Sequence, residues 1–285
     1  MSEEFRTVTR KKWIAHKSIN KRIRTISDKG YDKDFPEIDV DKFMTKLDTL
    51  RERMEDSDYF TQAMVTLKES LTKISTKLEE NNTAVTPKRL VCLGIGPFTR
   101  NFQALHQLAF ILCTQSYLKI EEAIYFDPVF RHSEKEILAK LNCLVMTENC
   151  EGKYEADVRT LFYLPHCPNC LTNNLLWKNW QPDLLSNIIL INNSFESLSC
   201  SKPERLLRLD AAYILDIMPH GEELPLEDDY EVQNIFNDLS VHIFPPSRLN
   251  NIEDREFWTK KEEPKYSGDD AEMISAEAFA KLSIA

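Results

Sequence analysis

The feature that most constrains the fold is a repeated alternation of short apolar runs with stretches of helical periodicity. Five runs of three to five residues, most of them closed by Gly, Asp, Pro or Asn, are typical of buried strands: 89–93, 123–126, 144–146, 160–164 and 188–191. Helical spacing marks residues 101–118, 133–142 and 171–180. Such alternation predicts an α/β protein with a mostly parallel, Rossmann-like sheet of the methyltransferase type and helices on both faces. Residues 239–244 are expected to add an antiparallel strand.

Two helices are expected before this sheet, as a hairpin within residues 39–81. Their apolar positions repeat at helical spacing: Val40, Phe43, Met44, Leu47, Leu50 and Met54 in the first, then Phe60, Met64, Leu67, Leu71, Ile74 and Leu78 in the second. Asp39 suits the N-cap of the first helix, and Ser57 and Asp58 interrupt the chain and cap the second. We expect the hairpin to pack on the main domain; a short coiled coil or a partner-binding face is the alternative.

The 285-residue chain carries a net charge of −10, and its charges are unevenly placed. Residues 1–30 hold nine basic and three acidic residues, which makes this segment +6 and the remainder −16. A basic arm on an acidic body is typical of an interaction tail, and a nuclear signal is the sharper alternative. The acidic balance argues against a general nucleic-acid binder, so protein partners of unknown identity are expected. We divide the chain into a basic flexible arm (1–35), a helical hairpin (36–84), a Rossmann-like domain (85–250) and an acidic polar tail (251–285).

The seven cysteines are scattered, and several lie inside apolar runs, where Cys behaves as a small hydrophobe. Their odd number, in a chain with no apolar signal segment, predicts free thiols in a reducing compartment. No stretch approaches ~18 uninterrupted apolar residues, so no membrane span is expected. These features predict a cytoplasmic protein, with a nuclear location as the alternative.

The residues best placed to bind a ligand follow the predicted strands, because open α/β sheets bind ligands beyond the carboxyl ends of their strands. Gly94 and Gly96 follow the first strand and allow close backbone approach, and Pro97 comes next. The pattern is GxG followed by Pro rather than GxGxxG, and a purely structural turn is the alternative. Asp127 ends the second strand, where an acidic residue accepts hydrogen bonds from ribose hydroxyls in nucleotide-binding sheets. Its alternative role is that of a turn-forming Asp-Pro.

The segment PHCPNC at 165–170 follows the fourth strand and contains the single CxxC of the chain. Zinc is not favoured, because a structural site needs four ligands and His166, Cys167 and Cys170 supply three at most. A redox CxxC and a Cys-Pro haem-responsive motif are further alternatives. We favour a loop that lines the site, with Pro165 and Cys167 beside the ligand and His166 as its hydrogen-bonding or acid/base group.

Asn193 and Ser194 follow the fifth strand and are candidates for binding a polar ligand, with capping of the next helix as the alternative. Trp177 and Trp180 lie on the preceding helix and are expected in the core. The sequence holds no Walker loop, GxSxG elbow, HExxH or EF-hand loop. Hydrolase and kinase functions therefore have no support.

Four separated blocks, in this order, resemble the sensitivity-to-red-light-reduced (SRR-like) family. They are LGIGPFTRNFQALHQLAFILC (93–113), YFDPVF (125–130), TLFYLPHCPNCLTNNLLWKNW (160–180) and ILINNSF (189–195). The resemblance covers residues 88–200. The family pattern maps onto Gly94, Gly96, Pro97, Gln107, Asp127, Pro128, Pro165, His166, Cys167, Asn174, Leu176, Asn179, Trp180, Asn193 and Ser194. Cys170 is not part of that pattern, and Asn192 stands where a glycine is common.

The resemblance implies a regulatory role, because family members are linked to circadian clock input in plants and to clock-gene expression and haem biosynthesis in animals. Two functions stay open. The first is a non-catalytic regulator that keeps a Rossmann-like pocket for a small nucleotide-like ligand or a partner. The second is an S-adenosylmethionine-dependent methyltransferase: Gly94 and Gly96 would approach the cofactor's amino-acid end, Asp127 would hold its ribose, and His166 would line the acceptor site. The loop at 165–168 departs from the Asn/Asp-Pro-Pro-aromatic loop of amino methyltransferases.

Overall fold

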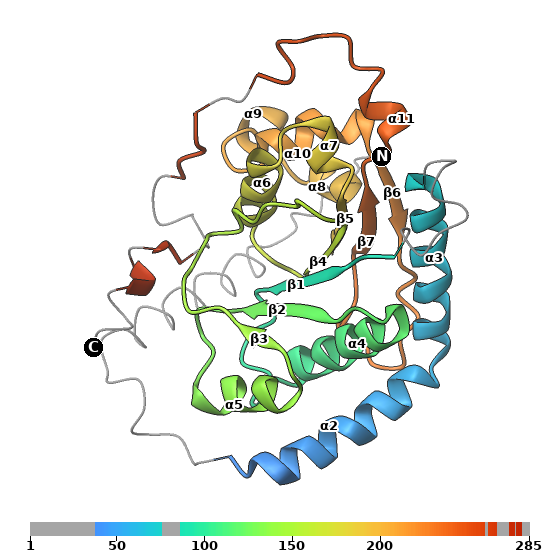
Figure 1. The fold of residues 1–285 in the computed structure, drawn as a ribbon, viewed down its shortest axis with the longest axis vertical. Coiled ribbons are helices and arrows are strands. Elements are labelled where there is room, and N and C mark those ends of the chain that lie inside the picture. The colour runs from blue at the N-terminus through green and yellow to red at the C-terminus, as the bar shows by residue number, and fades with distance from the viewer. Residues whose placement is uncertain (1–37, 76–85, 260–261, 267–273, 277, 281–285) are drawn as a thin grey trace, which may run out of the picture. The chain divides into compact units, whose positions relative to one another are not determined.

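A seven-stranded sheet is the centre of the computed structural model, which describes residues 38–75, 86–259, 262–266, 274–276 and 278–280 (Figure 1). The strand order is β3-β2-β1-β4-β5-β7-β6. The strands are β1 (Arg89–Leu93), β2 (Glu122–Phe126), β3 (Leu144–Val145), β4 (Thr160–Leu164), β5 (Ile188–Asn193), β6 (Glu222–Pro225) and β7 (Leu239–Ile243). The strands β1 to β5 are parallel, and β7 is antiparallel to both β5 and β6. The prediction of an α/β protein with a mostly parallel sheet is confirmed.

Helices connect these strands. They are α2 (Val40–Glu55), α3 (Asp58–Ile74), α4 (Phe102–Leu118), α5 (His132–Lys140), α6 (Asn169–Lys178), α7 (Pro182–Leu185), α8 (Phe195–Ser201), α9 (Glu204–Leu207), α10 (Ala212–Ile217), the 3₁₀ turn η2 (Met218–His220) and α11 (Pro246–Leu249). The chain leaves β1 through α4 and α5 toward one edge, then starts again at β4 on the other side of β1. Because parallel crossovers are right-handed, this reversal places α4 and α5 on one face of the sheet and α6 on the other.

Both faces of the sheet are buried, and the strand side chains alternate between them. Tyr163 of β4 belongs to the core that also contains residues of α2 to α5. Its neighbours Phe162 and Leu164 are equally buried and point to the opposite layer. Burial on both faces explains why the parallel strands are almost continuously apolar in sequence.

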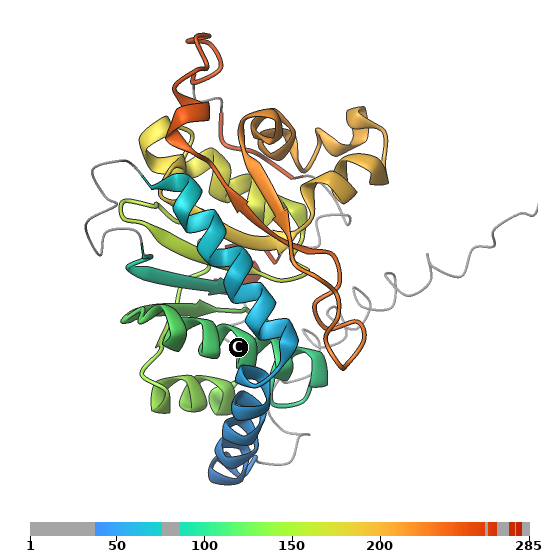
Figure 2. The same cartoon turned by 90° about the vertical axis from the view of Figure 1, so that its right-hand side faces the viewer.

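The helices α2 and α3 form where the periodicity predicts them. Asp39 and Ser57 cap them, by accepting hydrogen bonds from the backbone N–H groups of Lys42 and Phe60. In both views, however, α3 leads away from α2 instead of returning alongside it (Figures 1 and 2). The helix α2 packs on α4, and α3 packs on β7 and β6. The apolar stripes that suggested a hairpin are thus buried against the sheet and its helices, in one continuous core.

Described parts of the predicted tail lie against α6 and the β3–β4 connection. The indole N–H of Trp180 donates to the carbonyl of Phe257 at 2.6 Å, and the Asn149 side chain donates to the carbonyl of Ile274 at 2.7 Å. The hydroxyl of Tyr266 donates to Asn174 Oδ1 at 2.9 Å. The predicted basic arm lies outside the described residues, as does the end of the predicted hairpin. Within the described part of the chain, no helix combines the length and apolarity that crossing a membrane requires.

Candidate functional site

The carboxyl ends of β1 and β2 meet in a turn built around Gly94, Gly96 and Asp127. The N–H of Gly94 donates to the carbonyl of Phe126 at 3.1 Å, and the N–H of Gly96 donates to Asp127 Oδ2 at 2.7 Å. Both glycines have positive φ, 68° and 83°, a region that glycine adopts without strain. The other Asp127 oxygen, Oδ1, accepts from the N–H of Val129 at 2.9 Å. The carboxylate is therefore bound by the backbone of its own turn and of the glycine turn.

Asp127 is buried, with 8% of its surface exposed. This burial raises the pKa of its carboxyl from 3.8 to about 6, although the hydrogen bonds from Val129 and Gly96 favour the charged form. Glu134 of α5 adds a smaller contribution in the same direction as burial. A ligand hydroxyl arriving here would share this carboxylate with two backbone donors or displace them.

Cys167 fills the space in front of Gly94. Its Sγ atom lies 3.3 Å from the carbonyl oxygen of Leu93, and a methyl group built at Gly94 would overlap that sulfur. The absent side chain of Gly94 is therefore what lets the β4–α6 loop close on the end of β1. Burial also raises the pKa of the Cys167 thiol, which keeps it protonated at neutral pH.

His166 lies beside this cysteine in the chain but makes different contacts. Its backbone N–H donates to Asn193 Oδ1 at 2.8 Å, and its ring Nε2 lies 3.2 Å from the carbonyl oxygen of Ile235. Its φ is 52°, in the left-handed region that few residues other than glycine adopt. Asn193 thus fixes the backbone of the loop after β4 from the end of β5, and the imidazole remains exposed to solvent.

A segment that the sequence did not single out covers this edge. Residues 230–238, here called the cover segment, precede β7 and are held by side chains of α4 and of the β4–α6 loop. Gln107 Nε2 donates to the Ile235 carbonyl at 3.0 Å, and Gln103 Nε2 donates to the Asn234 carbonyl at 2.9 Å. His106 Nδ1 lies 2.7 Å from the Tyr230 hydroxyl. These contacts join residues more than a hundred positions apart, so no local pattern could reveal them.

The remaining predicted site residues have visible local roles. The Pro97 carbonyl accepts from the N–H groups of Arg100 and Asn101 at the turn before α4, and Pro165 is buried. Ser194 caps α8, because its side chain accepts from the N–H of Ser197 at 3.0 Å. The predicted site residues thus form two groups, one around Asp127 and the other made of His166 and Asn193. Among the described residues, no hydrogen bond joins Asp127 to His166 or Asn193.

Several other positions of the family pattern are structural amides of α6. Asn179 is fully buried; its Oδ1 accepts from the N–H of Ala156, and its Nδ2 donates to the carbonyl of Tyr154 at 2.7 Å. Asn174 is also fully buried, and its Nδ2 donates to the carbonyl of Glu151 at 2.8 Å. These amides tie α6 to the irregular chain before β4. Buried amides need such partners, since an unpaired one costs about 1–3 kcal/mol.

Other possible sites lie away from these loops. The described residues hold no cluster of three or more His, Cys, Asp or Glu side chains that would suit a metal ion. A hollow of about 300 Å³ opens between α2 and α4, and none of the strand-end residues lines it.

The family model described as the SRR1 domain matches residues 66–243, which span the sheet from α3 to the end of β7. The chain is 44% identical to an SRR1-like protein of Drosophila melanogaster over 282 residues, which cover 99% of this chain and 97% of the relative. It is 33% identical to an SRR1-like protein of Mus musculus, over 61% of this chain and 71% of the relative.

A plant protein is similar over a shorter stretch. The Arabidopsis thaliana protein named SENSITIVITY TO RED LIGHT REDUCED 1 is 32% identical over 53% of this chain and 55% of its own length. No solved structure matches the chain.

Proposed function

The chain belongs to the SRR1 family, and on that premise we propose that it is a regulatory protein acting in clock-gene expression and haem biosynthesis. The plant relative's name refers to sensitivity to red light, which is a response of the organism and not a chemical reaction. The near-complete coverage of the Drosophila melanogaster relative supports carrying a whole-protein role across. We place this role in the cytoplasm, with the nucleus as the alternative.

One observation favours a regulator over an enzyme. The polar groups at the strand ends are bonded to the chain itself: Asp127 to two backbone N–H groups, and His166 to the cover segment. Cys167 occupies the space that a ligand would use to approach Gly94. A catalytic site of this fold would need these groups directed toward a substrate.

The test is a replacement in Drosophila melanogaster that lacks its SRR1-like protein. We expect expression of this chain to restore the rhythm of clock-gene transcripts and the haem content to the level reached with the fly protein itself. A tagged copy would show its compartment in the same animals. The proposal fails if the chain accumulates to the level of the fly protein and both readouts stay at the mutant value.

A second candidate is a Rossmann-like methyltransferase, favoured by one feature. Gly94, Gly96 and Asp127 meet where the strand order reverses between β1 and β4, which is where doubly wound sheets bind nucleotides. In this candidate these three residues would hold S-adenosylmethionine once the cover segment moved, and His166 would line the acceptor site. The other cofactor-binding residues would be Pro97, Pro165, Cys167, Asn193 and Ser194. For both candidate functions, the division of the chain into an arm (1–35), a helical hairpin (36–84), a Rossmann-like domain (85–250) and a tail (251–285) remains a proposal.

Calorimetric titration with S-adenosylmethionine separates the two candidates. Micromolar binding that is lost in Asp127→Ala would support the methyltransferase. Intact protein that releases no heat across the same titration, while it remains folded by circular dichroism, would rule that candidate out.

A further inference from the structure

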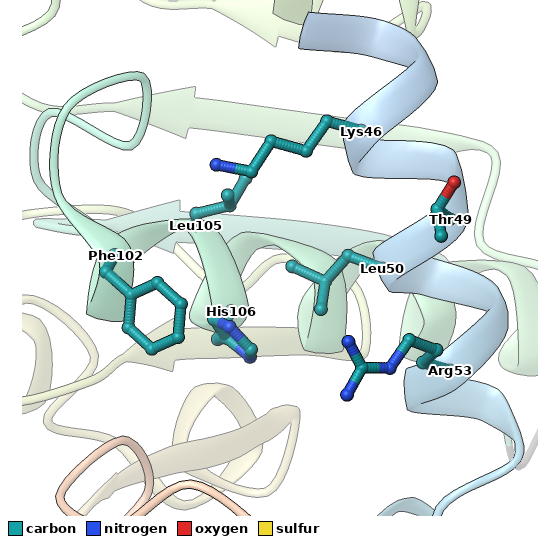
Figure 3. A pocket seen from close by; sticks show the side chains of 7 residues that line it. All are labelled: Lys46, Thr49, Leu50, Arg53, Phe102, Leu105 and His106. Carbon is teal, nitrogen blue, oxygen red and sulfur yellow. The ribbon is translucent and has the colours of Figure 1, made fainter.

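The hollow between α2 and α4 combines an apolar floor with cationic and aromatic walls (Figure 3). Its lining residues are Lys46, Thr49, Leu50, Arg53, Phe102, Leu105 and His106. The first four come from successive turns of α2, and the last three from the first turns of α4. Figure 3 shows the Lys46, Leu50 and Arg53 side chains pointing from α2 toward α4. We call this feature the α2–α4 hollow.

Two cationic side chains, Lys46 and Arg53, line this hollow on a chain whose net charge is −10. Lys46 makes no ion pair or hydrogen bond with any residue that the structure describes. Arg53 pairs with Glu231 of the cover segment at 2.7 Å, but both side chains are more than half exposed. Burial lowers the pKa of His106; the charge of Arg53 adds to this effect, and the charge of Glu231 opposes it. An incoming carboxylate would therefore meet one free cation and one held only by an exposed pair.

The apolar part of the hollow is also unusual. Phe102 is 56% exposed at the first turn of α4, where its ring lies against His106 with a centroid distance of 4.4 Å. Leu50 and Leu105 are buried and form the floor. Among the lining residues, Phe102 alone is a large apolar side chain with most of its surface exposed, so a ligand side chain on the floor would pack against its ring. Phenylalanine and arginine are both enriched at protein–protein interfaces.

We propose that the α2–α4 hollow docks an acidic peptide segment of a partner protein. One apolar side chain of that segment would lie over Leu50 and Leu105 against Phe102, and its carboxylates would pair with Lys46 and Arg53. The volume of about 300 Å³ is at the lower limit of small-molecule pockets and suits one or two side chains. This inference deepens the proposed regulatory function, on which it rests, by naming the surface that a partner would contact.

The experiment is selection of a random peptide library on the whole immobilised chain, followed by fluorescence anisotropy with each selected peptide. We expect the selected peptides to share Asp or Glu next to Leu, Phe or Trp. The double charge reversal Lys46→Glu/Arg53→Glu should weaken their binding at least about tenfold, and Phe102→Ala by about fivefold. Glu231→Gln should tighten binding by about two- to fivefold, because it frees Arg53 from its internal competitor.

The matched control is Lys202→Glu/Arg205→Glu, which changes the same residue types and the same charge at exposed positions at the C-cap of α8 and on α9. It should leave binding within about twofold of the wild type. Peptides without acidic residues, binding that is equal in the α2 charge reversal and the control, or selection of no peptide would each overturn the proposal. The replacement experiment in flies would be unaffected by that result, so failure of the docking surface is distinguishable from failure of the regulatory role.

Discussion

Substitution of Gly94 by alanine gives the sharpest test of how the strand ends are closed. The residue has a φ of 68°, and a methyl group at this position would overlap the Cys167 sulfur. Two separable penalties follow. The left-handed backbone costs an alanine about 1 kcal/mol, and forcing a methyl group into a filled space costs about 1–3 kcal/mol. We therefore expect Gly94→Ala to lower the free energy of unfolding by about 2–4 kcal/mol.

Removal of the sulfur should cancel the second penalty. Cys167→Ala alone should cost about 1–2 kcal/mol, because it leaves a small cavity in front of Gly94. In the double variant, the new methyl group enters that cavity, so only the backbone penalty of about 1 kcal/mol should remain. Independent effects would instead add to about 3–6 kcal/mol, which predicts a favourable coupling of at least about 2 kcal/mol between the two positions.

The assay is urea unfolding of the wild type, both single variants and the double variant, followed by circular dichroism. Gly96→Ala is the matched control, because its φ is also positive at 83° but the nearest atom, Ala104 Cβ, is 3.7 Å from the new methyl group. It should lose only the backbone penalty, and Cys167→Ala should not rescue it. Additive losses at Gly94 and Cys167 would refute the close packing of the β4–α6 loop on β1.

Three further predictions concern buried polar groups. Because burial raises the pKa of Asp127 from 3.8 to about 6, the native state binds this proton more tightly than the unfolded chain. In urea, the free energy of unfolding of the wild type should therefore rise by about 2 kcal/mol relative to that of Asp127→Asn as the pH falls from 7 to 4. A difference that stays constant over this pH range would contradict the burial argument. Burial has the opposite effect on His242, because it lowers the pKa of this imidazole. As the pH falls from 6.5, the free energy of unfolding should therefore decrease more steeply for the wild type than for His242→Gln. Parallel curves for the two proteins would show that the ring titrates as it does in the unfolded chain. Tyr266→Phe should destabilise the chain by about 1–3 kcal/mol in urea, because Asn173 and Asn174 lose their shared hydroxyl, while Tyr117→Phe at a half-exposed position should be neutral.

The strands of the sheet were predictable because burial on both faces leaves an unbroken apolar run between turn residues. β1 and β4 have the bounds that the sequence predicts, and β7 is antiparallel as expected. β6 was missed, because Glu222–Pro225 contains two glutamates and a proline and resembles a loop. Those residues are tolerated there because β6 is an edge strand, paired with β7 alone among the described strands.

Periodicity identified the buried stripes of α2 and α3 but not what covers them. Phe43 and Leu47 repeat at helical spacing whichever partner they contact. The spacing is therefore as compatible with a hairpin as with packing on α4. In the fold, Phe43 packs against Phe98 of the β1–α4 turn, with ring centroids 6.0 Å apart. The partner is set by tertiary geometry, which spacing along one segment does not contain.

The same limit applies at the strand ends. Parallel strands of one sheet end at one edge, so the placement of Gly94 and Asp127 at the same edge followed from the predicted parallel sheet. The packing of the Cys167 sulfur against Gly94 could not be predicted, because it depends on how far the β4–α6 loop turns back toward β1. The hydrogen bond between His166 and Ile235 spans 69 positions, and nothing in the intervening sequence signals it.

At the strand ends the polar side chains already have hydrogen-bond partners within the chain, whereas Lys46 in the α2–α4 hollow has none among the described residues. A ligand at the strand ends must share or displace the hydrogen bonds to the Asp127 carboxylate, and each one displaced costs about 1.5–3 kcal/mol. It must also separate the cover segment from Gln107 and His166. A carboxylate at Lys46 meets no competing side chain among the described residues. Partner docking therefore requires only the exposed Arg53–Glu231 pair to open, whereas binding at the strand ends requires Asp127 and the cover segment to rearrange together. Faster amide hydrogen exchange in residues 230–238 on ligand addition would accompany strand-end binding alone, since docking at the hollow leaves those hydrogen bonds in place.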